Sequence, residues 1–150
     1  MGAVTEFANN GGPVVGICNG FQVLTEAGLL PGALQKNAGL KFLCQPAELV
    51  VASSRSVLTS QAEVGQRLMI PINHFEGNYT CSPETLQQLQ DNDQIVVTYA
   101  DNPNGSVGDI AGISNEQGNV VGLMPHPERA THELLGSTDG SVLLQSLLAA

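Results

Sequence analysis

A cysteine set among glycines, in Gly16-Ile17-Cys18-Asn19-Gly20, is where side-chain chemistry is first expected. The pattern is typical of a sharp strand-to-helix turn that lifts a nucleophile above a sheet and leaves no room for side chains two residues on either side. A helix beginning just after Cys18 would lower the pKa of its thiol, because the first turn carries partial positive charge and free N–H groups. The N–H of Asn19 would then point to where an oxyanion forms. The alternative is a small buried cysteine at a strand end.

A thiolate nucleophile needs a base, and Pro125-His126-Pro127-Glu128-Arg129 offers one directly after the apolar run Val120 to Met124. Pro127 favours an extended backbone at His126, and in an extended segment residues two apart point the same way. Glu128 can therefore face the same side as His126. A carboxylate there would fix the imidazole tautomer and stabilise its protonated form, as the third member of a triad does. Taken alone, this histidine could equally be an ordinary loop residue.

The other histidines and cysteines are weaker candidates. His74 follows a predicted strand beside Glu76 and could orient a substrate or a partner, although a solvated loop histidine is the simpler interpretation. His132 is expected on an exposed helix surface, and Cys44 and Cys81 are expected in the core. No cluster of ligand-type side chains predicts a metal site, and neither phosphate-binding fingerprint occurs.

Apolar periodicity and turn residues predict the elements that position these side chains. A helix ends at Val4 to Ala8, a buried strand covers Pro13 to Ile17, and a second helix covers Phe21 to Ala27. Further strands are expected at Glu48 to Ala52, Arg67 to Ile72, Gln94 to Tyr99 and Val120 to Met124, further helices at Ser82 to Gln90 and Asp139 to Ala149, and turns at Asn78 to Thr80 and Asp101 to Gly105. Helices alternating with apolar strands imply an α/β domain.

Composition limits the class of protein. The 150 residues, 42% of them hydrophobic, suit one globular domain over residues 1–150. Five Lys and Arg against 14 Asp and Glu make a net charge of −9, which disfavours nucleic acid and anionic membranes as partners. Three widely spaced cysteines favour reduced thiols and a cytoplasmic protein, and neither a signal peptide nor a membrane span is predicted.

Longer runs around both motifs carry a family resemblance. They are Gly16 to Gln22, Thr25 to Leu34, Lys41 to Cys44, Asn104 to Ser106, Asp109 to Gly112 and Gly122 to Ala130. Together they resemble the free-standing glutaminase subunits of phosphoribosylformylglycinamidine synthase, which are class I glutamine amidotransferases. The resemblance implies an α/β fold, the flavodoxin-like three-layer sandwich of that class, incomplete at its N-terminus.

The resemblance also implies a role for each site residue. Cys18 would attack the side-chain amide of L-glutamine, His126 would act as general base and acid, and Glu128 would orient it. Gln22 would help to hold the bound glutamine, and Asn19 would supply one oxyanion N–H. Glutamine would pass through a thioester to glutamate and ammonia.

The implied partners are a synthetase subunit (PurL), which receives the ammonia, and a small subunit (PurS) in de novo purine biosynthesis. ATP and magnesium are expected on the synthetase, and no cofactor is expected in this chain. The shortage of cations here agrees with that division, because the phosphates would belong to the partner.

Two departures from the family pattern are visible. Family members begin with further strand and helix units, about 60–70 residues. The resemblance implies that this region supplies a second oxyanion N–H. Weak solubility and little activity are therefore expected for this chain in isolation. Phe75 also stands where a smaller residue is expected. The alternatives are a catalytically inactive docking module of the complex and a related cysteine hydrolase that cleaves peptides or acyl esters.

Overall fold

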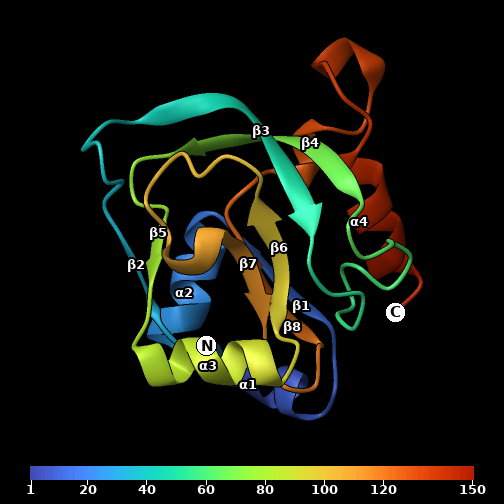
Figure 1. The fold of residues 1–150 in the computed structure, drawn as a ribbon. Helices are drawn as coiled ribbons and strands as arrows, with labels where there is room; N and C mark the ends of the chain where they lie inside the picture. The colour runs from blue at the N-terminus through green and yellow to red at the C-terminus, as the bar shows by residue number, and fades with distance from the viewer.

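The computed structural model describes residues 1–150. Six strands form one sheet in the order β1-β8-β7-β6-β3-β4, and two more form a small separate sheet, β2-β5 (Figure 1). The strands are β1 Val14–Ile17, β2 Ala33–Gln35, β3 Leu43–Val51, β4 Arg67–His74, β5 Asn78–Thr80, β6 Ile95–Tyr99, β7 Ile110–Ser114 and β8 Val120–Leu123. The helices are α1 Gly2–Asn9, α2 Asn19–Glu26, α3 Pro83–Asp91 and α4 Gly140–Leu148, with short 3₁₀ turns η1 Val107–Asp109, η2 Pro127–Arg129 and η3 Glu133–Leu135.

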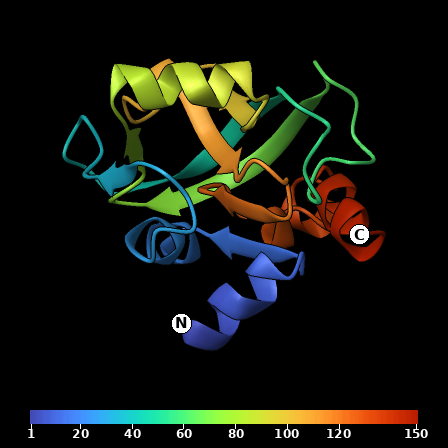
Figure 2. The ribbon, with the colours of Figure 1, turned by 90° about the horizontal axis from the view of Figure 1, so that it is seen from below.

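Helices cover both faces of the large sheet. Figure 2 shows α3 and α4 on opposite sides of the sheet, and α1 and α2 share with α3 one group of buried apolar side chains. One group of buried apolar side chains joins β3, β4 and β6 to α4, and a second joins α1, α2 and α3 to β7 and β8. The expected α/β layered architecture is confirmed.

The pair β1 and β8 is the part of the sheet that matters most for the site. These two strands run parallel, with Ile17 beside Leu123, whereas every other pair in the sheet is antiparallel. The helix α2 lies directly over β8, because Phe21 is fully buried and a side chain at Gly122 would overlap its ring. This close approach fixes the start of α2 against the sheet.

The expected helices and strands are all present, within a few residues at their ends. Three strands were not expected: β2, β7 and β5, the last at Asn78–Thr80, where a turn was predicted. That prediction was wrong because Tyr79 is completely buried and pairs with Leu34 across the small sheet. Burial of a large aromatic side chain outweighs the turn preference of Asn78.

The prediction of a core position for Cys44 was also wrong, since Cys44 is exposed, whereas Cys81 is half-buried and packs against the second apolar group. Cys44 lies in the first half of β3, which pairs with β4 alone; pairing with β6 begins only at Leu49. Side chains of a strand stretch with a neighbour on one side only are less covered. No helix of the structure is long and apolar enough to cross a membrane.

Candidate active site

Cys18 occupies the turn between β1 and α2 in a backbone conformation that residues other than glycine rarely adopt. Its φ is 56° and its ψ is −107°. The N–H of Cys18 donates to the Leu123 carbonyl at 2.8 Å, and its own carbonyl accepts from Gln22 N–H at 3.3 Å. Backbone strain of this kind persists only where the surrounding structure enforces it, and it is concentrated at functional sites.

The two glycines of the motif are not equivalent. A Cβ added to Gly16 would lie 2.5 Å from the carbonyl oxygen of Gly20, so only glycine fits at Gly16. A Cβ added to Gly20 would meet nothing within 4 Å. The predicted lack of room on both sides of Cys18 is therefore correct for Gly16 and wrong for Gly20, because the turn brings the Gly20 backbone towards Gly16 and leaves the outer side of Gly20 open.

The parallel pairing of β1 and β8 brings the second motif to the same place. Cys18 follows Ile17 and the His126 segment follows Leu123, so both leave the carboxyl ends of neighbouring strands. Open α/β sheets carry their sites at such edges. The N–H of His126 also donates to the Pro71 carbonyl at 2.9 Å, which ties this loop to β4.

His126 and Glu128 form a close pair. Nδ1 of His126 lies 2.6 Å from Oε1 of Glu128. Because a carboxylate accepts, Nδ1 carries the proton in this contact, and the neutral ring then presents a lone pair at Nε2. Nε2 of His126 is buried and has no hydrogen-bond partner. The arrangement leaves that atom available to take a proton from a thiol.

The Cys18 thiol makes a different contact in this structure. Its Sγ donates to the Asn73 carbonyl at 3.6 Å, and no hydrogen bond joins it to His126. Burial raises the pKa of the Cys18 thiol; the Asn19 N–H and the Arg129 guanidinium offset this in part, and the Glu128 carboxylate adds to it. The predicted lowering of the thiol pKa by the start of α2 was wrong, because loss of hydration outweighs the backbone N–H.

Gln22 and Asn19, the predicted substrate-binding residues, differ in position. Asn19 is exposed and lines the cavity in front of Cys18. Gln22 is half-buried, and its side chain donates to Glu26 Oε1 at 3.0 Å instead of lining that cavity. Their roles towards a bound amino acid stay predictions.

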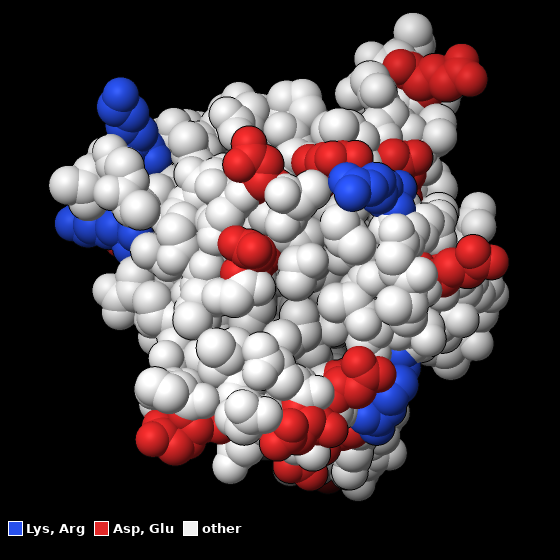
Figure 3. Space-filling model, in the orientation of Figure 1, with Lys and Arg blue, Asp and Glu red and all other residues white.

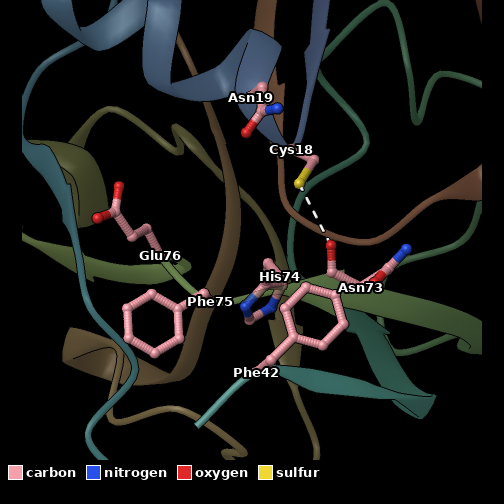
Figure 4. A pocket seen from close by; sticks show the side chains of 7 residues that line it. All are labelled: Cys18, Asn19, Phe42, Asn73, His74, Phe75 and Glu76. Carbon is pink, nitrogen blue, oxygen red and sulfur yellow. Dashed lines mark hydrogen bonds between the residues drawn. The ribbon is translucent and has the colours of Figure 1, made fainter. Parts of the chain in front are cut away.

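The cavity in front of Cys18 has a volume of about 320 Å³, within the range of small-molecule sites. Figure 4 shows its lining, which comes from two distant parts of the chain besides the Cys18 turn. These lining residues are Cys18, Asn19, Phe42, Asn73, His74, Phe75 and Glu76. Sequence reasoning missed Phe42 and Asn73 here, and the only available signal was the pair His74 and Glu76 following a strand.

His74 is not the solvated loop residue that was the simpler expectation. It is the last residue of β4 and 3% exposed, and its Nδ1 lies 3.0 Å from Oδ1 of Asn37. Burial, and after it the charge of His126, lowers the pKa of His74 to about 4. The prediction failed because pairing with Leu43 extends β4 as far as His74. His132 is exposed, but it caps η3 instead of lying on a helix surface.

No group of three or more His, Cys, Asp or Glu side chains converges to hold a metal ion. The titratable groups near Cys18, Arg129 and Glu128, act on its thiol through their charges. The geometry therefore supports thiol chemistry assisted by a histidine and carboxylate pair.

Comparison with known proteins decides the family. The model of the CobB/CobQ-like glutamine amidotransferase domain matches residues 1–141. This chain belongs to that family of glutamine amidotransferases. This amidotransferase chain is 57% identical over 148 residues to the phosphoribosylformylglycinamidine synthase subunits PurQ of Lacticaseibacillus paracasei and Lacticaseibacillus casei. It spans 65% of the length of those relatives and they match 99% of it.

Solved structures agree with this assignment. The amidotransferase chain matches a chain in the structure of PurLQS from Thermotoga maritima with 42% identity and a TM-score of 0.88, over 97% of this chain and 65% of that one. A glutamine amidotransferase of the same organism matches at 16% identity and a TM-score of 0.58, over 97% of this chain and 58% of that one. The last likeness shows the fold alone. The predicted fold class and the predicted resemblance to PurQ subunits are confirmed.

Proposed function

We propose that this protein acts as the glutaminase subunit of a phosphoribosylformylglycinamidine synthase, releasing ammonia from L-glutamine. One observation carries the proposal. Cys18, in a strained turn at the end of β1, lies beside the loop that holds the His126 and Glu128 pair at the end of the parallel strand β8. The names of the PurQ relatives, at 57% identity, support the choice of substrate and complex.

In the proposed reaction the Cys18 thiol leaves the Asn73 carbonyl and passes its proton to Nε2 of His126. The thiolate attacks the amide carbon of glutamine and a C–S bond forms. The resulting oxyanion accepts a hydrogen bond from the N–H of Asn19. His126 returns its proton to the amide nitrogen as the C–N bond breaks, and ammonia leaves. Water, deprotonated by His126, then hydrolyses the thioester to glutamate and restores the thiol.

Glu128 acts through His126 in this scheme. Its carboxylate holds the proton on Nδ1, so Nε2 is the atom that exchanges protons with sulfur and nitrogen. Gln22 would need to exchange its contact with Glu26 for one with the substrate. Both roles follow from position and from the family resemblance.

The ammonia would pass to a synthetase subunit (PurL), with a small subunit (PurS) in the same cytoplasmic complex. ATP and magnesium would bind the synthetase, since this chain has five Lys and Arg in all. Figure 3 shows those on one face as separate side chains among more numerous acidic ones. Residues 1–150 would act as one domain in that complex.

A second candidate function, an inactive docking module of the same complex, is favoured by one observation. The Cys18 thiol has a raised pKa and bonds to a backbone carbonyl instead of to His126. A thiol held in this way is a poor nucleophile.

Glutamate release by the purified chain, alone and mixed with a PurL and PurS pair, separates these functions. The matched variants are Cys18→Ala and Cys44→Ala, because Cys44 is an exposed thiol that does not line the cavity. We expect turnover that increases with the partners, vanishes in Cys18→Ala and is unchanged in Cys44→Ala. Co-purification with the partners without turnover would favour the docking module, and cleavage of esters or peptides in place of glutamine would favour a different cysteine hydrolase.

A further inference from the structure

Three Asn-Gly pairs occur in the chain, at Asn10-Gly11, Asn19-Gly20 and Asn104-Gly105. At such a pair the backbone nitrogen of the glycine can attack the side-chain carbon of the asparagine, because glycine has no Cβ to hinder the approach. The side-chain nitrogen leaves as ammonia and a succinimide ring forms. Water then opens the ring to aspartate or isoaspartate. The hydrogen bonds around each pair decide which of them is free to react.

Asn104-Gly105 is buried in a hydrogen-bonded loop. The Asn104 side chain is 1% exposed, and its Nδ2 donates to the Gly77 carbonyl at 2.8 Å. The N–H of Gly105 donates to Oδ1 of Asn102 at 2.8 Å. Both reacting groups are therefore engaged, and the loop must open before the nitrogen can attack.

Asn10-Gly11 lies on the surface at the end of α1. Asn10 is exposed, but the N–H of Gly11 donates to the Ala8 carbonyl at 3.0 Å. This hydrogen bond must break before the Gly11 nitrogen can lose its proton and attack. We therefore expect it to slow the reaction at Asn10 by about 2- to 10-fold.

Asn19-Gly20, beside the nucleophile, has both reacting groups free. The Asn19 side chain is exposed and lies next to Cys18 at the cavity (Figure 4). The N–H of Gly20 is in the first turn of α2, where the helix offers no earlier carbonyl to accept it. A Cβ added to Gly20 would meet nothing within 4 Å, so its outer side is unobstructed.

The start of α2 also favours the charges that develop in this reaction. The Gly20 nitrogen attacks as an anion, after its proton has passed to hydroxide in the solvent. The first turn of a helix carries partial positive charge, which stabilises that anion and the oxyanion that forms on Asn19. Helix ends fray readily, and the buried Phe21, which packs α2 on the sheet, follows the pair and can stay in place.

We propose that Asn19 is a site of spontaneous deamidation, and that this modification lowers the reactivity of the Cys18 thiol. The bond between Cγ and Nδ2 of Asn19 breaks, one water is consumed, one ammonia is released, and one new carboxylate remains. That carboxylate lies next to Cys18 and opposes formation of its thiolate, as the Glu128 carboxylate already does. The modification is independent of the proposed function, because it involves only side chains and backbone of this chain and water.

Incubation of the chain in mildly alkaline buffer with a reductant tests the site, with all three asparagines followed by peptide mass spectrometry. The urea-unfolded chain gives the intrinsic rate at each pair. In the folded chain we expect Asn19 to convert at close to its unfolded rate, Asn10 about 2- to 10-fold more slowly than unfolded, and Asn104 almost not at all. Alkylation of Cys18 by iodoacetamide at neutral pH should fall in step with conversion of Asn19, to about one tenth, because one added charge raises a neighbouring pKa by about one unit.

Two variants and a control separate the modification from its effect. Gly20→Ala places a methyl group beside the attacking nitrogen, at a position with room for it, and is expected to keep its Cys18 alkylation rate during the incubation. Asn19→Asp carries the product carboxylate from the start and is expected to show the rate lowered about tenfold. Asn10→Gln removes the exposed pair at the end of α1 and is expected to lose its rate as the original chain does.

Each outcome has a separate meaning. Protection of Asn19 in the folded chain as strong as that of Asn104 would overturn the modification site. An Asn19→Asp chain that is alkylated as fast as the original, or a loss of rate that Gly20→Ala does not prevent, would overturn the effect on Cys18. None of these results bears on the proposed function, since alkylation of Cys18 is measured without glutamine.

Discussion

The packing of the turn that carries Cys18 predicts different effects for two alanine substitutions, Gly16→Ala and Gly20→Ala. A Cβ at Gly16 would lie 2.5 Å from the oxygen and 2.6 Å from the carbon of the Gly20 carbonyl. An ordinary contact begins at 3.4 Å, so the first turn of α2 must move by about 0.9 Å to admit the methyl group. Cys18 lies on the segment that moves.

The magnitude follows from this displacement. Overpacking of this kind costs about 1–3 kcal/mol, which for a chain of 150 residues lowers Tm by roughly 2–12 °C. Misplacement of a reacting group by about 1 Å costs about 10²-fold in rate. A Cβ added at Gly20 would meet nothing within 4 Å, and alanine gains up to about 1 kcal/mol from helix propensity. The Tm of the Gly20→Ala chain should therefore stay the same or rise.

Thermal unfolding followed by circular dichroism measures the first effect. The rate at which an electrophilic glutamine analogue modifies Cys18, followed by mass spectrometry, measures the second. We expect Gly16→Ala to lose both stability and labelling rate, and Gly20→Ala to keep both. A Gly16→Ala chain as stable and reactive as the original, or a Gly20→Ala chain that is equally damaged, would refute the packing account of the turn.

Three further predictions concern titrating groups. Glu128→Gln should lower the glutaminase rate by about 10²–10⁴-fold, because Nδ1 of His126 loses its acceptor, while Tm barely changes because the Glu128 side chain is 47% exposed; a rate within threefold of the original would contradict the orienting role. Because the pKa of the Cys18 thiol is raised, its alkylation by iodoacetamide in the absence of ligand should rise with pH to a midpoint above about 8.5, the ordinary thiol value; a midpoint near neutral pH would show an activated thiol. His74 has its pKa lowered from 6.5 to about 4, so only the unfolded chain takes up its proton between these values, and the free energy of unfolding should fall as pH falls, by up to about 3 kcal/mol. Urea titrations of the original chain and His74→Asn check this, and an equal pH dependence in both would count against it.

Local patterns were sufficient for much of the fold. The short β-branched run before Cys18 and the apolar run before His126 are the strands β1 and β8, and the Ser82 cap begins α3 as its side chain accepts from Thr85 N–H at 3.1 Å. Signals of this kind depend on a few neighbouring residues. Tyr79 shows the limit, because β5 exists only through pairing with a segment more than 40 residues away.

The sequence by itself determined the nucleophile turn, the histidine and carboxylate pair and the family, because each depends on residues within a few positions of one another. Only the tertiary structure decided that Cys18 is buried enough to raise its pKa, that His74 is a neutral buried acceptor, and that Phe42 and Glu76 share the cavity with Cys18. These properties depend on loss of hydration and on contacts between strands distant in the chain. Desolvation is set by everything packed around a group, and no local pattern records it.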